Sequence, residues 1–348
     1  YNRGECSKGT IDKIFQRQLR QLISRDERIL ALTEKYLSLS DLIYLWKRVI
    51  GSGLVGGKTI GMLIGRSILE KVNPRWAELL ESHDSFFIGS DIFYSFLVEN
   101  DCWGIRQNQK DPATLLDGAE EGRKRILRGD FPDYIIARFS NMLDYFGQSP
   151  IIVRSSSLLE DNFGNSFSGK YESVFCANQG TKQNRLKEFI NAVRFVYASS
   201  MSEEALIYRA ERNVLERDEQ MALLVQRVSG KPYNDLFFPQ LAGVGLSYNP
   251  YVWDESIDPE AGILRLVFGL GTRAVNRSDD DYTRVVALNA PDKRPEAGFD
   301  EVARYAQRKM DMINLEENCF ASGYFIDVAN QRPELPIEMF ASVDRGVE

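Results

Sequence analysis

One segment combines an arginine, hydroxyl side chains and glycines in the order that a phosphate-binding loop needs. It begins as an apolar strand at residues 151–153 and turns polar at Arg154, which three serines follow. A guanidinium group can hold two phosphate oxygens at once, while glycine and serine supply backbone N–H groups and hydroxyls. Residues of these two types continue along the segment at Gly164, Ser166, Ser168, Gly169 and Ser173.

The acidic pair Glu160 and Asp161 lies within this segment and has two possible roles. Either residue could orient Arg154 or cap the next turn. The alternative to a phosphate site is a structural ion pair between Arg154 and Glu160. The two interpretations differ in whether the arginine is left for a ligand.

A second candidate lies in the glycine cluster GSGLVGGKTIG at residues 51–61. Gly56 and Gly57 permit a close backbone approach, and Lys58 follows them at the start of an expected helix, where anions are favoured. The cluster is not a complete Walker motif, because Ser52 stands where that motif needs a glycine. A plain turn before a helix is the alternative interpretation.

Composition excludes several classes of protein. The 348 residues carry a net charge of −7, which does not favour nucleic acid or an anionic membrane as a partner. The sequence has no apolar run of membrane-spanning length and no signal-peptide pattern at its start. Four widely spaced cysteines without a CxxC pair indicate free thiols in a reducing cytoplasm and argue against a familiar zinc site.

The chain has one histidine, His83, so any chemistry that needs an internal histidine depends on it. It lies between Ser82 and Asp84, just before an aromatic segment. We interpret it as a surface or packing histidine in a loop.

Periodicity predicts helices in the first half of the chain and strands in the second, which makes the class α+β. The expected helices are residues 11–37 with a break near 24–26, 39–50, 62–72, the end of 84–100, 130–147, 182–216 and 299–316. The expected strands are the start of 84–100, 151–153, 221–228, 241–250, 262–275 and 335–344. We expect a helical extension over 1–50, a first lobe over 51–220 and a second lobe over 221–348.

Six motifs resemble, in the same order, the N-terminal domain of phosphoenolpyruvate synthase and pyruvate phosphate dikinase. This is the PEP/pyruvate-binding domain, a two-lobed ATP-grasp fold. The motifs are GLVGGKTIGML, VRSSSLLEDNFGNSFSGKYESVF, LLVQRV, AGVGLSYNP, FGLG and PIEMFASVD. They run from about residue 51 to the end of the chain and leave residues 1–50 uncovered.

The resemblance implies roles for the residues that match the motifs, with ATP and Mg2+ as cofactors. Lys58 and Arg154 would be the catalytic cations that hold the ATP phosphates. Gly169 and Ser173 would belong to the loop that closes over the phosphates. Gln226, on the hinge strand, would lie on the adenine side of the bound ATP. Glu338 would be a magnesium ligand. A glutamate within the apolar PIEMF strand fits this role, since a buried carboxylate needs a partner.

The chain departs from the family pattern at several positions. Thr272 stands in place of a glutamate, and Arg265 in place of an acidic residue. The NQRP segment ending at Pro333 precedes the glutamate strand, whereas the family's Leu-Gln-x-Arg-Pro strand follows it. Neither that strand nor the phosphohistidine domain follows before Glu348. We therefore expect a fragment, or a subunit that works with another chain.

Together these features predict the ATP-binding, phosphotransfer half of a kinase of the pyruvate, water dikinase type. Its partner would be a phosphohistidine acceptor domain, in a missing C-terminal part or on a separate chain. The alternative is a degenerate module that binds nucleotide, or serves assembly, without catalysis.

Overall fold

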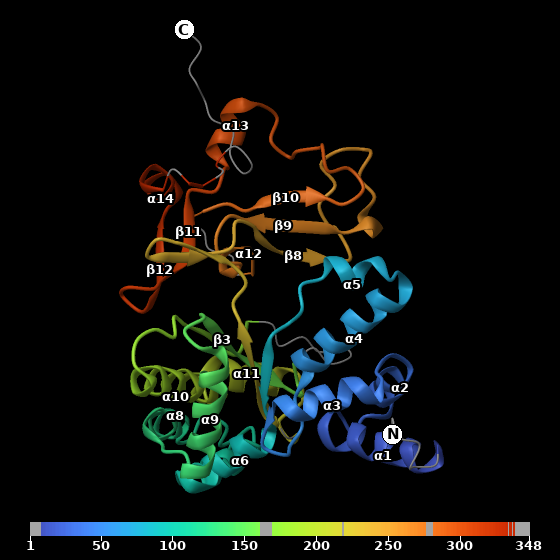
Figure 1. Ribbon diagram of the computed structural model, residues 1–348, viewed down its shortest axis with the longest axis vertical. Coiled ribbons are helices and arrows are strands. Elements are labelled where there is room, and N and C mark those ends of the chain that lie inside the picture. Colours follow the sequence, from blue (N-terminus) through green and yellow to red (C-terminus); the bar gives the residue numbers. More distant parts are fainter. Residues whose placement is uncertain are drawn as a thin grey trace. The chain divides into compact units, whose positions relative to one another are not determined.

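A computed structural model describes residues 8–160, 169–217, 219–275, 281–332, 334, 335 and 337. The chain forms two compact units, residues 1–228 and 229–348, each with helices and sheets (Figure 1). This confirms the α+β class. Within the described ranges, no helix is both long and apolar enough to cross a bilayer.

A five-stranded sheet with the order β1-β2-β5-β3-β4 forms the centre of the first unit. β1 runs parallel to β2, and the other neighbours are antiparallel. The strands are β1 (Val49–Ile50), β2 (Ser85–Ile88), β3 (Ile151–Ser157), β4 (Ser173–Cys176) and β5 (Met221–Arg227). Because β5 pairs with β2 and β3, it belongs to the first unit, whereas the sequence-based boundary fell at residue 220.

Helices surround this sheet. They are α1 (Lys8–Leu22), α2 (Glu27–Tyr36), α3 (Leu39–Arg48), α4 (Gly57–Val72), α5 (Arg75–Leu79), α6 (Ser90–Glu99), α7 (Trp103–Asn108), α8 (Ala119–Arg128), α9 (Asp133–Phe146), α10 (Lys182–Ser199) and α11 (Glu203–Glu211). The expected break near residues 24–26 separates α1 from α2. Ser38 caps α3 in a capping box with Asp41, because a polar side chain there satisfies an otherwise unpaired N–H.

The two faces of the sheet pack into separate cores, since alternate residues of a strand face opposite sides. On one face, Val153 and Val225 lie in a core with Phe93, Phe139 and Phe189 from the helices. A second core joins the other face to the first four helices; its members include Leu19, Leu45, Ile60, Phe87 and Leu224. The N-terminal helices therefore share a core with the central sheet.

The second unit contains two antiparallel sheets, with the orders β10-β9-β8 and β12-β11-β7-β6. Its strands are β6 (Lys231–Tyr233), β7 (Leu236–Phe238), β8 (Ala242–Leu246), β9 (Ile263–Val267), β10 (Arg284–Ala287), β11 (Lys309–Asn314) and β12 (Cys319–Tyr324). Its helices are the 3-10 turn η1 (Pro259–Ala261), α12 (Thr272–Val275), α13 (Phe299–Arg304) and α14 (Phe325–Gln331).

The helix expected over residues 299–316 is wrong in its second half. Only α13 is helical there, and β11 pairs with β12 and β7. Four consecutive residues of β11, from Met310 to Ile313, are buried. A strand buried on both faces shows no alternation of polar and apolar residues, so its sequence does not identify it as a strand.

Candidate functional site

The candidate site begins where α4 meets the end of β3. Gly56 precedes α4 with a φ of +84°, a conformation that favours glycine. A Cβ at Gly56 would overlap the carbonyl oxygen of Ser156, and one at Gly57 would overlap that of Glu160. The two glycines are therefore required by the close approach of the chain's own backbone, which brings Lys58 beside the end of β3.

Each of the three serines after Arg154 has a definite hydrogen bond. Ser156 Oγ accepts from the N–H of Thr59 at 3.2 Å and donates to the Val55 carbonyl at 3.0 Å. It thus caps α4 from a neighbouring strand, since Gly56 has no side chain for this purpose. Ser157 donates to the backbone carbonyl of Glu219 at 2.6 Å.

Lys58 forms an ion pair with Glu160, and its Nζ lies 3.3 Å from Ser155 Oγ. The Glu160 side chain is 2% exposed, and that of Lys58 is 21% exposed. Glu160 also accepts from Ser155 Oγ at 2.9 Å and from the Ser157 N–H at 2.9 Å. Burial raises the pKa of Glu160 above its usual value, while the charge of Lys58 and these hydrogen bonds oppose that rise. Lys58 therefore stabilises a buried carboxylate and is fixed by it.

Glu160 thus pairs with Lys58, and Arg154 makes no ion pair with any residue that the structure describes. The alternative of an Arg154–Glu160 pair is wrong. Arg154 is half-buried on β3, opposite Ser173 of β4 and Leu224 of β5. Residues paired across strands share a face of the sheet, so Arg154 and Ser173 lie side by side.

Gln226 lies on the same face of the sheet, two residues along β5 from Leu224. Its Nε2 donates to Ser85 Oγ at 3.1 Å and lies 3.4 Å from Met62 Sδ on α4. The face that carries Arg154 is therefore the face that α4 covers, and three of the predicted site residues share it: Arg154, Ser173 and Gln226. The ammonium group of Lys58 lies instead beside Ser155, whose side chain faces the opposite side of the sheet.

Of the remaining predicted residues, only Gly169 lies within the described ranges. Gly169 is exposed and has a φ of +74°, and a Cβ added there would meet no other atom within 4 Å. The left-handed backbone, and not a close contact, therefore explains the glycine at this position. Gly164, Ser166, Ser168 and Glu338 all fall outside those ranges.

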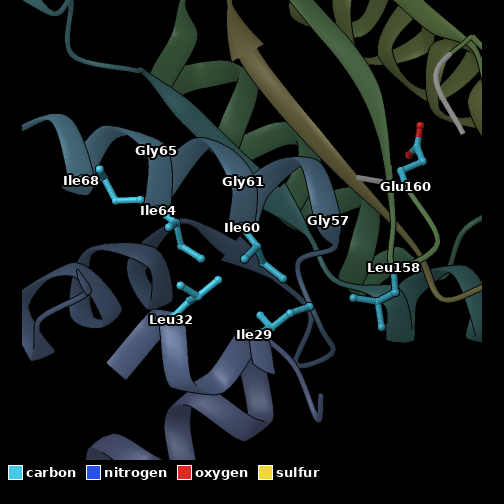
Figure 2. Close-up of a pocket in the computed structure, with 10 residues that line it drawn as sticks. All are labelled: Ile29, Leu32, Gly57, Ile60, Gly61, Ile64, Gly65, Ile68, Leu158 and Glu160. Carbon is cyan, nitrogen blue, oxygen red and sulfur yellow. The ribbon is translucent and has the colours of Figure 1, made fainter. Parts of the chain in front are cut away.

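An apolar groove runs along another side of α4 (Figure 2). Its volume is about 320 Å3, and it is lined by Ile29, Leu32, Gly57, Ile60, Gly61, Ile64, Gly65, Ile68, Leu158 and Glu160. The carboxylate of Glu160 points away from the isoleucine and leucine side chains (Figure 2). No lysine or arginine is among the residues that line this groove.

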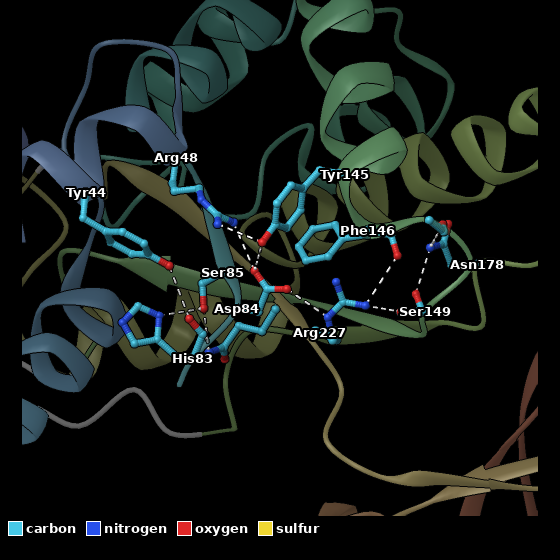
Figure 3. A network of polar contacts seen from close by, with 12 residues as sticks. Tyr44, Arg48, His83, Asp84, Ser85, Tyr145, Phe146, Ser149, Asn178 and Arg227 are labelled. Atoms are coloured by element: carbon cyan, nitrogen blue, oxygen red, sulfur yellow. Dashed lines mark hydrogen bonds and ion pairs between the residues drawn. The ribbon is translucent and has the colours of Figure 1, made fainter. Parts of the chain in front are cut away.

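A polar network lies at the start of β2 and the end of β5 (Figure 3). The carboxylate of Asp84 accepts from Arg48 at 3.0 Å, Tyr145 at 3.0 Å and Arg227 at 2.9 Å. Burial acts to raise the pKa of Asp84, but the hydrogen bonds from Arg227, Tyr145 and Arg48 outweigh it and leave that pKa lowered. The network joins Asp84, the residue before β2, to Arg227, the residue after Gln226 on β5.

His83 is half-buried beside this network and packs edge-on against Tyr44 (Figure 3). Its Nδ1 lies 3.3 Å from Ser85 Oγ. Burial, followed by the charges of Arg66 and Arg48, lowers the pKa of His83. The sequence interpretation of a packing histidine missed the contact with Ser85, because residue types alone do not show which side chain a loop residue reaches.

In the second unit, Thr272 replaces the glutamate of the family pattern and donates from Oγ1 to Asp311 Oδ2 at 2.5 Å. Asp311 also accepts from Arg273 at 2.9 Å and from Ser322 at 2.5 Å, and it is buried. Sequence reasoning missed Asp311 because it expected a helix there. The feature that could have revealed it is a single acidic residue between two methionines, because a buried carboxylate requires hydrogen-bond or ion-pair partners.

Residues 52–321 match the family described as "Pyruvate phosphate dikinase, AMP/ATP-binding domain". The chain belongs to this family. The match confirms the resemblance and the ATP-grasp-like fold, and it makes the chain an AMP/ATP-binding domain. Family membership alone does not decide which group receives a phosphoryl group.

Among curated proteins, the chain is similar to the "Uncharacterized phosphotransferase YvkC" of Bacillus subtilis (strain 168). The two are 25% identical over 221 residues, which is 63% of this chain and 23% of that protein. The chain thus spans about a quarter of the length of this relative. A dikinase-family ATP-binding domain and a phosphotransferase relative both support a phosphotransfer role.

Proposed function

We propose that this chain binds ATP through Lys58 and Arg154 and passes a phosphoryl group to a histidine on a separate domain or chain. The observation that carries the proposal is that Arg154 has no ion-pair partner among the described residues, while Lys58 lies at the same end of β3 with its Nζ 3.3 Å from Ser155 Oγ. Two cations at the end of a strand and the start of a helix suit a triphosphate, whose charge must be neutralised during transfer.

Glu160 has a positioning role in this proposal. Its carboxylate is fixed by Ser155 and Ser157 and in turn directs the ammonium group of Lys58. Gln226 would lie on the adenine side, and Gly169 and Ser173 would close over the phosphates. The proposed reaction is of the pyruvate, water dikinase type.

Mg2+ belongs to the proposal through Glu338. Among the residues that the structure describes, no group of three or more His, Cys, Asp or Glu side chains could hold a metal ion. Glu338, which lies outside them, is proposed as a ligand from the family resemblance. The metal would neutralise phosphate charge when bound.

We further propose that the protein works in the cytoplasm. Cys102, Cys176 and Cys319 are free thiols, as a reducing compartment requires.

Phosphate transfer from ATP labelled at the β- and γ-positions tests this function. We expect acid-labile label on a separately supplied phosphohistidine domain and none on His83, whose ring nitrogen Nδ1 is engaged with Ser85. The label would be located by phosphopeptide mapping. Label on His83 would make the chain a self-contained kinase and overturn the proposal of a separate acceptor.

A degenerate, non-catalytic nucleotide-binding module is the second candidate. It is favoured by Thr272, whose hydroxyl binds Asp311 where the family pattern has a glutamate. This candidate predicts that ATP binds but that no acceptor domain is labelled. The transfer assay therefore separates the two functions.

A further inference from the structure

The side-chain amide of Gln226 is held by a chain of hydrogen bonds that starts at the only histidine in the sequence. His83 Nδ1 lies 3.3 Å from Ser85 Oγ, and Ser85 Oγ lies 3.1 Å from Gln226 Nε2. Ser85 is fully buried, so water does not replace either partner. The orientation of the Gln226 amide is therefore set by which way the Ser85 hydroxyl points.

The direction of this chain depends on the protonation of His83. When the imidazole is neutral and Nδ1 is unprotonated, Nδ1 accepts a hydrogen bond from the Ser85 hydroxyl. Ser85 Oγ then accepts a hydrogen bond from Gln226 Nε2. The second amide hydrogen of Gln226 can be directed at Met62 Sδ, 3.4 Å from Nε2. Both amide hydrogens are then used within the protein. Within the described part of the chain the carbonyl oxygen accepts no hydrogen bond, so it is the group left for a ligand.

We propose that Ser85 and His83 are positioning residues that make Gln226 present a hydrogen-bond acceptor, and so select a 6-amino purine over a 6-oxo purine. This inference rests on the proposed function, which places the base beside Gln226. Adenine carries a donating amino group at position 6, whereas hypoxanthine carries an accepting oxygen. A fixed carbonyl favours the first and repels the second, because a mismatched polar pair leaves both groups unsatisfied.

The charged and titratable groups around His83 keep the imidazole neutral near pH 7. Arg48 and Tyr44 face it from α3, Arg66 and Glu70 from α4, and Asp84 from the segment before β2 that also carries His83. Burial and the two arginines disfavour the imidazolium, and they outweigh the two carboxylates. Protonation would turn Nδ1 into a donor to Ser85 Oγ. The Ser85 hydroxyl could then donate to the Gln226 carbonyl and reverse the amide.

Calorimetric titration with Mg-ATP and Mg-ITP tests this inference, because these nucleotides differ only at positions 1 and 6 of the base. For the unaltered chain at pH 7.5 we expect ATP to bind about tenfold more tightly, a ratio equivalent to about 1.4 kcal/mol. Ser85→Ala and His83→Ala should reduce the ratio to about one to three. If Ser85→Ala does not fold, His83→Ala provides the test, because His83 is only half-buried and its replacement disturbs the fold less.

Two further variants separate positioning from general structural damage. His83→Asn can offer an acceptor near the position of Nδ1 without titrating, so it should keep the ratio near ten and make it independent of pH between about 5.5 and 7.5. Ser200→Ala removes another fully buried serine hydroxyl, which donates to the Tyr197 carbonyl in the same unit, and should leave the ratio unchanged. In the unaltered chain the ratio should fall on acidification.

The outcomes distinguish this inference from the proposed function. Absence of ATP binding in the unaltered chain would refute the proposed function itself. ATP binding with no preference over ITP, or a preference that survives in both Ser85→Ala and His83→Ala, would refute only the positioning roles of Ser85 and His83.

Discussion

Removal of the Lys58 cation should destabilise the first unit in a way that depends on pH. Lys58→Met leaves the carboxylate of Glu160, which is 2% exposed, without its cation. Removing one partner of a fully buried pair costs about 3–5 kcal/mol, whereas exposed pairs contribute about 0–1 kcal/mol. The Lys58 side chain is 21% exposed, and Glu160 keeps its hydrogen bonds from Ser155 and Ser157, so we expect a loss of about 2 kcal/mol at pH 7.5.

The loss should shrink on acidification. Burial already raises the pKa of Glu160 in the folded protein, and loss of Lys58 removes the main group that opposes this rise. When the folded pKa lies above the unfolded one, the folded state gains stability as the pH falls through that interval. Protonated Glu160 needs no cation, so the deficit of Lys58→Met at pH 5 should be smaller than at pH 7.5.

Urea denaturation followed by tryptophan fluorescence provides the assay. In a Trp253→Phe background, the remaining tryptophans, Trp46, Trp76 and Trp103, all lie in the first unit. The double variant Lys58→Met/Glu160→Gln should show a coupling energy of about 2 kcal/mol in a double-mutant cycle. Lys182→Met breaks an exposed pair with Asp144 and should cost less than about 0.5 kcal/mol. A loss for Lys58→Met that is the same at both pH values would refute this reasoning.

Four further substitutions test other parts of the first unit. Arg154→Lys keeps the charge but loses the planar fork, so ATP affinity should fall about tenfold in calorimetry while the melting temperature stays within about 2 °C. Gly57→Ala should destabilise the fold strongly, because its Cβ would overlap the Glu160 carbonyl, whereas Gly61→Ala, with no atom within 4 Å, should stabilise it by about 0.5–1 kcal/mol in urea denaturation. Asp84→Asn should flatten the loss of stability between pH 5 and pH 3, since the lowered pKa of Asp84 stabilises the fold only where the carboxylate is ionised.

The local pattern of the sequence was enough to place the phosphate-binding candidates. Residues 151–153 predict a buried strand, and the glycines before Lys58 predict a close backbone approach at the start of a helix. Both features follow from short-range rules on β-branched residues, glycine and helix termini. The order of the six motifs then identified the family without any knowledge of contacts.

Contacts between residues that lie far apart in the sequence could not be predicted from local patterns. Lys58 and Glu160 are 102 residues apart, and nothing local indicates that this lysine, instead of Arg154, is the partner of the buried acid. The same holds for His83, whose contact with Ser85 matters because Ser85 also holds Gln226, 141 residues further along. Asp311 was missed for a different reason, since its strand is buried on both faces and has no period of two.

The central claim is that Lys58 and Arg154 hold the phosphates of ATP, and titration calorimetry with Mg-ATP tests it most directly. We expect the unaltered chain to bind ATP, and Arg154→Ala to lose at least about tenfold in affinity while its urea denaturation profile is unchanged. The control Arg194→Ala, whose guanidinium pairs with the exposed Asp130, should bind ATP as the unaltered chain does. Absence of binding heat with the unaltered chain, or full affinity in a folded Arg154→Ala variant, would contradict the account.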